Sequence, residues 1–445
     1  MNPNILFLLI DSLRSDKTYG FKKKSQTPNL DNLIKKGQYF SQAISASDGT
    51  YVSLGSIFTG QHPFNHNVTW FENHSNARKN LSYLKENGYN LYATVHDHPF
   101  FETLTREFNG KDIGKNFPYE RIFEGLGEKI INRLQDLKSK TPWFYYVHIM
   151  DLHVAKELPS EFEKDEFGQD SFDRRLSVID LWLGKILQNI DLKKTLVVIT
   201  ADHGEFEHDL SIDYGEVPKL QNSFKKIKSS SPKFVEPLGV KLFVFLRENI
   251  KKRRLEKIKK NLTDEEKRNF FERGHDNLFD DAIRVPLIFS GHGIENFKVN
   301  SQQVSHIDIF PTILDIIDIS KPEWLDGTSL IPLFRNEKIN NLIAYVESIP
   351  TIDKELGDSI GIRTSNYKYF RSRKNSNENL HLYDLILDPK ESNNIANENP
   401  KLVLELEEKL TKIRTNVTLS NNTEKMSEEK IAKAKQILKE LGYDK

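Results

Sequence analysis

An aspartate ends each of two apolar runs that lie far apart in the chain. Residues 5–10 run directly into Asp11, and residues 195–200 lead, through one alanine, to Asp202 and His203. Continuous apolar runs of this length are typical of strands buried on both faces of a parallel sheet. Ligands collect at the carboxyl ends of such strands, so we expect two carboxylates and one imidazole to hold a divalent cation there. The alternative is that each aspartate only caps the segment that follows its strand.

Between these two runs, residues 45–60 are mostly small or hydroxyl-bearing. The stretch predicts a loop that runs into the N-terminus of a helix. Such an end has unpaired backbone N–H donors and a positive dipole, which makes it a favourable place to hold an anion or a nucleophile.

The elements that must position these residues alternate along the chain, which favours an α/β fold with a doubly wound sheet. Strands are predicted at 5–10, 91–95, 143–149, 195–200 and 283–289, and helices at 27–37, 81–88, 128–138, 177–189 and 308–317. Residues 361–364 and 367–370 predict paired strands of a small antiparallel sheet, and the tail from Lys401 is charged and helical.

The composition limits the function. Lys and Arg together equal Asp and Glu at 64 each, so the bulk charge gives no reason to expect a nucleic-acid partner. The chain has no Cys, which removes disulfides, thiolate ligands and cysteine nucleophiles. The first apolar run is too short for a signal peptide, and no run is long enough to span a membrane. These features predict a cytoplasmic protein.

A basic stretch departs from the rest of the chain. Residues 219–260 carry fourteen Lys and Arg against three Glu. One interpretation is a solvated surface insertion. The other is a basic amphipathic segment that contacts an anionic polymer or a membrane surface.

Taken in order, a set of short motifs resembles the sulfatase family of the alkaline-phosphatase-like superfamily. The motifs are residues 3–11, 27–33 and 59–60, Ala201 to Glu205, Arg284-Val285-Pro286, residues 304–312, 327–330 and 382–385. The resemblance implies an α/β/α sandwich with a mostly parallel central sheet and a small C-terminal α+β subdomain. We expect a catalytic domain over 1–345 with a basic helical insertion at about 210–273, a small antiparallel sheet over 346–400, and a charged helical tail over 401–445.

The resemblance also implies the ligands of one divalent cation, which are Asp11, Asp202, His203 and the nucleophile. Many sulfatases have a second aspartate and an asparagine where this chain has Ser12 and His203, so the set is more similar to the phosphonate-ester and phosphoglycerol-transferring branches. Oxygen ligands with one imidazole suit Mn²⁺, Ca²⁺ or Mg²⁺, and zinc if more histidines converge.

At the nucleophile position the chain has Thr50. Sulfatases carry Cys or Ser there, in the motif Cys/Ser-x-Pro-x-Arg, and oxidise it to formylglycine, whereas here Val52 and Leu54 replace the Pro and the Arg. Thr50 therefore stays unmodified. A metal lowers the pKa of bound water from about 15.7 to about 7, and we expect it to acidify a threonine hydroxyl in the same way. The alternative role for Thr50 is a helix N-cap.

Histidines stand where the family has its remaining anion-binding residues, and both lysines are replaced. The resemblance places His96, His98, His153 and His275 at these positions. We expect His98 and His153 to contact the transferred group or to protonate the leaving oxygen. A single histidine is more often structural.

The first hypothesis is a metal-dependent, sulfatase-like hydrolase that cleaves sulfate, phosphate or phosphonate esters through a covalent Thr50 intermediate. A second is a transferase that passes a phospho-group to a glycan or polymer acceptor, with the basic insertion holding that acceptor. A third is an inactive member that only binds. In each case the expected partner is an anionic ester, carried by a small molecule, a glycan or a polymer.

Overall fold

The computed structural model describes residues 2–70, 72, 74–114, 119–153, 158–205, 278–295, 297–340, 342–349, 358–415 and 427–440. The predicted insertion at 210–273, with its basic stretch 219–260, lies outside these residues, and so does His275. The predicted division of the chain into three regions stays a prediction.

At the centre of the main sheet lies β1 (Asn4–Ile10), which is buried along its whole length. It pairs in parallel with β5 (Trp143–Ile149) on one side and with β6 (Thr195–Thr200) on the other. Leu9 lies opposite His148 in the first pair and opposite Thr200 in the second. The three strands therefore end in register, and the residues that follow them leave the sheet side by side.

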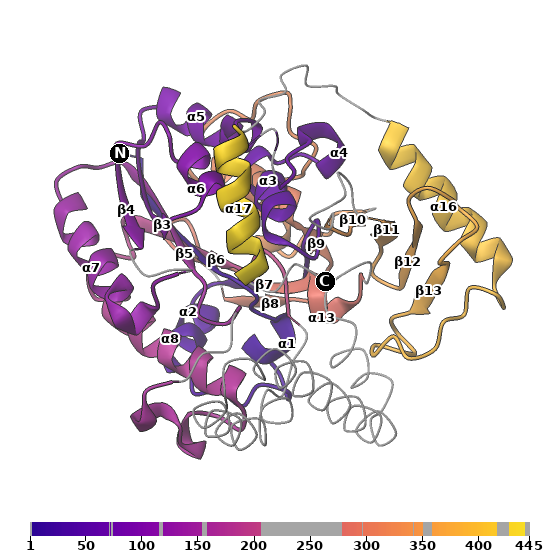
Figure 1. Cartoon of the computed structure of the whole chain (residues 1–445), viewed down its shortest axis with the longest axis horizontal. Helices are drawn as coiled ribbons and strands as arrows, with labels where there is room; N and C mark the ends of the chain where they lie inside the picture. Colours follow the sequence, from indigo (N-terminus) through magenta and orange to yellow (C-terminus); the bar gives the residue numbers. More distant parts are fainter. Residues whose placement is uncertain are drawn as a thin grey trace, which may run out of the picture. The chain divides into compact units, whose positions relative to one another are not determined.

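Around this centre the sheet has nine strands in the order β4-β3-β5-β1-β6-β7-β2-β8, with β9 also paired to β2 (Figure 1). Most pairs are parallel, and β7 runs antiparallel to both neighbours. The other strands are β2 (Gln38–Ile44), β3 (Asn90–His96), β4 (Gly110–Gly114), β7 (Arg284–Gly291), β8 (Lys298–Asn300) and β9 (Val304–Ser305). The predicted α/β fold with a mostly parallel central sheet is thus confirmed.

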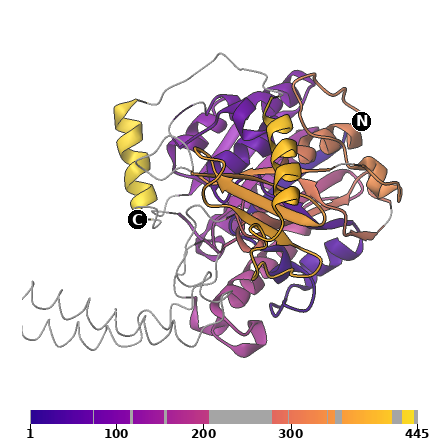
Figure 2. The same cartoon turned by 90° about the vertical axis from the view of Figure 1, so that its right-hand side faces the viewer.

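Two groups of helices accompany this sheet (Figures 1 and 2). One group packs α2 (Pro28–Lys35) and α7 (Leu126–Leu137) against α8 (Ser171–Leu187), and the other packs α5 (Lys79–Glu86) and α14 (Ile309–Ile316) against α3 (Thr50–Thr59). Shorter helices are α1 (Ser15–Thr18), α4 (Pro63–His66), η1 (Asn76–Arg78), α6 (Pro99–Leu104), η2 (Ile122–Glu124), η3 (Ser160–Phe162), η4 (Asp165–Phe167), α13 (Asp280–Ile283), η5 (His306–Asp308) and α15 (Ile331–Phe334).

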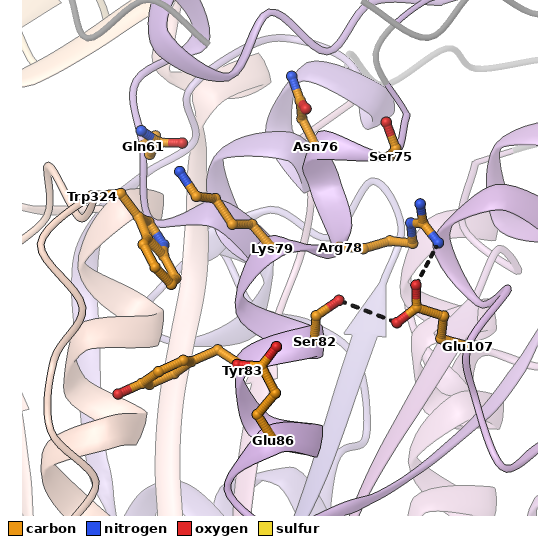
Figure 3. A pocket seen from close by; sticks show the side chains of 10 residues that line it. All are labelled: Gln61, Ser75, Asn76, Arg78, Lys79, Ser82, Tyr83, Glu86, Glu107 and Trp324. Atoms are coloured by element: carbon orange, nitrogen blue, oxygen red, sulfur yellow. Dashed lines mark hydrogen bonds and ion pairs between the residues drawn. The ribbon is translucent and has the colours of Figure 1, made fainter. Parts of the chain in front are cut away.

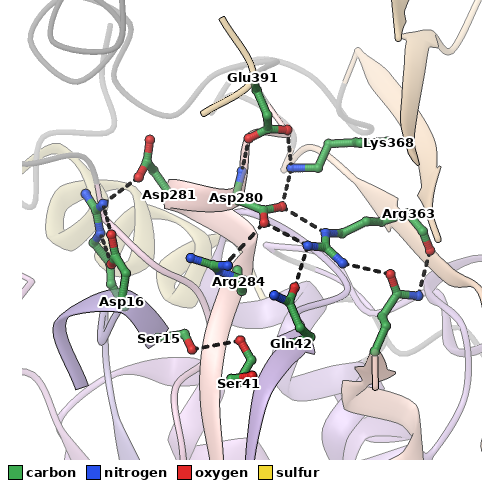
Figure 4. Close-up of polar contacts among 12 residues, drawn as sticks. Ser15, Asp16, Ser41, Gln42, Asp280, Asp281, Arg284, Arg363, Lys368 and Glu391 are labelled. Carbon is green, nitrogen blue, oxygen red and sulfur yellow. Dashed lines mark hydrogen bonds and ion pairs between the residues drawn. The ribbon is translucent and has the colours of Figure 1, made fainter. Parts of the chain in front are cut away.

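The C-terminal part forms its own antiparallel sheet, in the order β10-β11-β12-β13. The strands are β10 (Ala344–Glu347), β11 (Ser359–Arg363), β12 (Tyr367–Ser372) and β13 (His381–Asp384), followed by α16 (Pro400–Thr415) and α17 (Glu428–Glu440). Buried ion pairs join it to α13: Lys368 Nζ lies 2.6 Å from Asp280 Oδ1, and Arg363 Nη2 lies 2.9 Å from Asp280 Oδ2 (Figure 4).

The predicted elements are present with shifted ends. The helix predicted at 177–189 begins six residues earlier, at Ser171, because the Asp170 side chain accepts a hydrogen bond from Asp173 N and caps it. The helix predicted at 81–88 ends before Asn87. Among the described residues, no helix has both the length and the apolar character needed to cross a bilayer.

Candidate active site

The side chains of Asp11, Asp202 and His203 meet beyond the carboxyl ends of β1 and β6. His203 Nε2 lies 3.8 Å from Asp11 Oδ1 and 3.6 Å from Asp202 Oδ2, and all three residues are buried. Two overlapping groups each have ligand atoms within 4.8 Å of one another: Asp11 with His153 and His203, and Asp11 with His148 and Asp202. The structure therefore brings the three ligands that the sequence predicted into one cluster.

The hydrogen bonds of this cluster fit a bound cation. His203 Nδ1 lies 2.6 Å from Gly204 O, and a carbonyl can only accept, so Nδ1 carries a proton. Nε2 is therefore the nitrogen that would release its proton and bind a cation. Asp202 Oδ1 accepts from the backbone N–H groups of Ser12 and His203, whereas the buried Asp202 Oδ2 has no hydrogen-bond partner among the described residues. A buried carboxylate oxygen without a partner is costly, and a divalent cation would remove that cost.

Asp11 is held in place by His148, a residue that the sequence analysis did not select. The Tyr146 hydroxyl lies 2.7 Å from His148 Nδ1, and His148 Nε2 lies 3.2 Å from Asp11 Oδ2. Because the carboxylate can only accept, Nε2 donates to Asp11 and Nδ1 accepts from the tyrosine. The only signal in the sequence was a histidine inside an otherwise apolar and aromatic strand.

The two carboxyl groups have opposite electrostatic environments. Burial alone would raise the pKa of Asp11, but His153, His148 and His203 together hold it well below its usual range. The pKa of Asp202 is raised, first by burial and then by the charge of Asp11. Two carboxylates this close repel each other, so a cation between them would stabilise both in their charged form.

Thr50 is the first residue of α3, and its hydroxyl points at the same cluster. Thr50 Oγ1 lies 3.4 Å from His203 Nε2 and close enough to Asp202 to lower the pKa of that carboxyl. Gly49, the residue before the helix, is needed here because a Cβ atom would collide with the Ile349 side chain. The hydroxyl thus lies at a helix N-terminus, where backbone dipoles favour negative charge.

His153 and Ser12 form the next layer of the cluster. Ser12 Oγ donates to Asp11 Oδ1 at 2.9 Å and lies 2.9 Å from His153 Nδ1, which is itself 3.2 Å from Asp11 Oδ1. Ser12 adopts a positive φ of 64°, a strained conformation for a residue with a side chain. Burial would lower the pKa of His153, yet Asp11 and Glu205 raise it above its ordinary value.

The other predicted histidines lie further out. His98 caps α6, where Nδ1 accepts from Phe100 N at 3.1 Å and Nε2 lies 2.9 Å from the Tyr51 hydroxyl. His96 Nε2 lies 3.0 Å from His148 O. Within the described residues, no hydrogen bond or ion pair joins His96 or His98 directly to Asp11, Asp202, His203 or Thr50, so their contact with a substrate stays a prediction. His275 lies outside the described residues.

Arg175 of α8 adds a positive charge that the sequence analysis missed. Its Nε and Nη1 atoms are buried and have no hydrogen-bond partner among the described residues. Its charge acts on Asp151 and on Glu205, and Glu205 Oε2 lies 3.7 Å from His153 Nδ1. Two buried guanidinium nitrogen atoms that make no hydrogen bond to the described residues have donors to offer, so this group is suited to an anionic ligand. One arginine in an amphipathic helix gives no signal in the sequence.

The loop after His203 is locked against α13. Gly204 N donates to Ala282 O at 2.7 Å, and a Cβ atom on Gly204 would collide with Asp281 O. Arg14, three residues after Asp11, pairs with Asp281 and with Asp16 (Figure 4). The two ligand-bearing loops are therefore tied to the same short helix.

Comparison with known proteins gives the family. The family model described as Sulfatase matches residues 3–319, and that described as N-sulphoglucosamine sulphohydrolase, C-terminal, matches residues 267–416. Arylsulfatase K of Mus musculus is 34% identical over 155 residues, which are 33% of this chain and 27% of the mouse protein. The Delta 4,5-hexuronate-2-O-sulfatase of Bacteroides thetaiotaomicron is 33% identical over 130 residues, 27% of this chain and 26% of the relative. The matched segments thus span less than a third of these relatives.

Solved structures show the same fold over most of the chain. The phosphonate monoester hydrolase of Agrobacterium radiobacter superposes with a TM-score of 0.65 and 16% identity, and the match covers 93% of this chain and 95% of that one. BT1596, a 2-O GAG sulfatase, gives a TM-score of 0.62 and 18% identity, with 93% of each chain covered. Since the Sulfatase model spans well over half of the residues, this chain belongs to the sulfatase family.

Proposed function

We propose that the chain is a metal-dependent ester hydrolase that cleaves sulfate, phosphate or phosphonate esters through a covalent intermediate on Thr50. The observation that carries the proposal is the position of the Thr50 hydroxyl, 3.4 Å from His203 Nε2 and at the N-terminus of α3. A threonine that only capped the helix would not need a cluster of two buried carboxylates and an imidazole in front of it.

Asp11, Asp202 and His203 would hold one divalent cation, with Thr50 as a further ligand. When bound there, the cation supplies positive charge opposite the reacting group and lowers the pKa of a neighbouring hydroxyl. Thr50 Oγ1 would then pass its proton to solvent water and attack the sulfur or phosphorus atom of the ester. The bond from Oγ1 to that atom forms while the bond to the leaving oxygen breaks, and the dipole of α3 favours the negative charge that develops.

His153 is the best placed group to protonate the leaving oxygen. In the metal-free site its pKa lies above the ordinary value because Asp11 and Glu205 outweigh the effect of burial, and Glu205 remains beside it to favour a proton when Asp11 binds the cation. Its Nδ1 atom faces Ser12 and Asp11, so Nε2 is the atom that could reach a substrate. In a second step, water would give a proton to His153 and attack the same sulfur or phosphorus atom. The bond from that atom to Thr50 Oγ1 would break, and Oγ1 would take up a proton from solvent as the sulfate or phosphate leaves.

An anionic glycan ester is the substrate class that we propose. The curated relatives include a hexuronate sulfatase, and one structural neighbour is described in complex with D-glucosamine-2-N,6-O-disulfate. Arg175, with its buried and unpaired nitrogen atoms, would bind a second anionic group of such a substrate. The transferase alternative depends on residues 219–260, which lie outside the described residues.

The test compares aryl sulfate, aryl phosphodiester and aryl phosphonate as substrates of the wild type, Thr50→Ala and Thr50→Ser. We expect Thr50→Ala to lower kcat by about a thousandfold or more, as for other nucleophiles, and Thr50→Ser to retain much of the activity because the hydroxyl is kept. Chelation of the metal should abolish turnover, and mass spectrometry of quenched enzyme should find the adduct on Thr50. Unchanged turnover in Thr50→Ala would exclude the covalent mechanism.

A further inference from the structure

A cavity of about 520 Å³ opens beside α5, at the opposite end of α3 from Thr50 (Figure 3). This volume is within the range of small-molecule binding sites. Gln61, which lines the cavity, follows the last turn of α3, whereas Thr50 begins that helix. Ten helical residues span about 15 Å, so a ligand in this cavity would leave the candidate active site free.

One wall of the cavity is made of two aromatic rings that are already fixed. Trp324 Nε1 donates to Asn80 Oδ1 at 3.0 Å, and the Tyr83 hydroxyl donates to Ser320 O at 2.9 Å. The two rings meet edge to face, with their centroids 5.6 Å apart. Because the two rings are already held in place, a ligand that packs against them would cost little side-chain conformational entropy, and such preorganisation favours affinity.

The cavity also presents one positive charge that no carboxylate of the described residues pairs with. Lys79 Nζ lies 4.6 Å from the centre of the Trp324 ring, an arrangement that attracts the cation to the ring. Burial lowers the pKa of Lys79, and among the described residues the charge of Asp326 opposes that effect. The Oδ2 atom of Asp326 is already used, however, since it accepts from His62 N and from Asn65 Nδ2 at 2.8 Å each.

The second cation of the cavity is neutralised, which isolates the charge of Lys79. Arg78 Nη1 lies 3.2 Å from Glu107 Oε1, and Ser82 Oγ donates to Glu107 Oε2 (Figure 3). The rest of the lining has amide and hydroxyl groups, including those of Gln61 and Ser75, and one further carboxylate, that of Glu86, which lies beside Tyr83 (Figure 3). Lys79, which forms no ion pair with the described residues, lies at the end of the cavity beside the fixed Trp324 ring. This end of the cavity suits a polar ring compound with a single negative charge.

We propose that this cavity is a second binding site, which holds an acidic sugar unit of a glycan. The carboxylate or sulfate of the sugar pairs with Lys79, its hydroxyls bond to groups such as Gln61 and Ser75, and the apolar part of its ring lies against Tyr83 and Trp324. The choice of a sugar rests on the proposed function, whereas the need for an anion rests on Lys79 alone. The site would anchor a long substrate while an ester elsewhere on the same chain reacts.

The test measures binding to the full-length chain by calorimetry and by quenching of tryptophan fluorescence. The probes are a hexuronate-containing disaccharide, a neutral disaccharide of the same size, and inorganic sulfate. The variants are Lys79→Met, which removes the charge but keeps most of the side chain, and Lys79→Arg, which keeps the charge. Lys138→Met is the matched control, because Lys138 is an exposed lysine beyond the end of α7. All carry Thr50→Ala, so that no probe is turned over.

We expect the acidic disaccharide to bind the protein that carries Thr50→Ala alone. Lys79→Met should weaken that binding by about ten- to a hundredfold, because this is the usual loss when a hydrogen bond to a charged group is removed. For Lys79→Arg and Lys138→Met, the Kd of the acidic disaccharide should stay within a few fold of its value for the protein that carries Thr50→Ala alone. Equal binding by the neutral disaccharide, or an equal loss in Lys138→Met, would overturn the proposal. If inorganic sulfate bound as tightly as the acidic disaccharide, the cavity would bind an anion but the claim that it recognises a sugar would be wrong. If the wild type hydrolysed none of the ester substrates, the proposed function would be wrong. The binding measurements on the cavity do not depend on that activity and would still test the second site.

Discussion

Replacement of His148 by phenylalanine is expected to weaken cation binding without removing any proposed ligand. His148 is fully buried and donates from Nε2 to Asp11 Oδ2 at 3.2 Å, while its Nδ1 accepts from Tyr146 at 2.7 Å. A phenylalanine ring fills similar space but has neither the donor nor the acceptor. Asp11 therefore loses the partner that fixes its orientation, although the carboxylate itself stays.

Two separate costs follow from this substitution. Loss of a partner behind a metal ligand typically lowers metal affinity by about 10- to 100-fold, and each factor of ten is about 1.4 kcal/mol. The Tyr146 hydroxyl is also left buried without an acceptor, which costs about 1–3 kcal/mol of folding stability. The double variant Tyr146→Phe/His148→Phe removes that hydroxyl, so it should recover part of the stability and none of the metal affinity.

Calorimetric titration of Mn²⁺ into metal-free protein measures the affinity, and urea unfolding of the same metal-free samples measures the stability. Tyr146→Phe alone is the control, because it keeps the His148 donor to Asp11. If His148→Phe binds Mn²⁺ within twofold of the wild type, Asp11 is not a ligand oriented by His148, and the reasoning fails. If the double variant regains affinity together with stability, the affinity loss came from misfolding.

Three further predictions test other parts of the site. Gly204→Ala should destabilise the chain and weaken metal binding, because the new Cβ would displace the loop after His203 from Asp281 O. Urea unfolding measures the loss of stability, and titration with Mn²⁺ measures the loss of affinity. Arg175→Gln should raise KM by about tenfold for a substrate with two anionic groups and much less for an aryl ester with one; equal changes would contradict its role. The pKa of Asp280 is held well below its usual range because neighbouring cations outweigh burial, so its stabilising contribution is full above about pH 4 and falls as the pH decreases further. In urea unfolding, the free energy of unfolding of Asp280→Asn should therefore depend less on pH below about pH 4 than that of the wild type.

The sheet and the ends of its strands could be predicted from the sequence because buried parallel strands have a simple pattern. Residues 5–10, 143–149 and 195–200 are apolar or aromatic runs interrupted only by His148 and bounded in the last run by Thr195 and Thr200, and the structure places them side by side. Asp11 and Asp202 then had to meet, since parallel strands end at the same edge. The position of Thr50 came from the family motifs, because a threonine in a hydroxyl-rich stretch has no distinctive spacing of its own.

The partners of the site could not be predicted in the same way. His148 meets Asp11 only because Leu9 lies opposite it in the β1–β5 pair, and strand register is a property of the folded sheet rather than of one segment. Arg175 comes from a helix that packs beside the site and looks like any charged surface helix in the sequence. The start of α8 was missed for a local reason, since Asp170 was not recognised as a cap.

The charges of the site indicate how a substrate anion must be held. The family resemblance predicts His98 and His96 as anion-binding groups, but burial lowers the pKa of each to about 3. Near neutral pH they are uncharged, so they can form hydrogen bonds but cannot balance an anion as lysine does. Among the described residues, the positive charge would therefore come from the proposed cation, from His153 and from Arg175. Because Arg175 comes from α8 rather than from the β1 and β6 ends, it can bind a second anionic group and so favour polyanionic over simple esters.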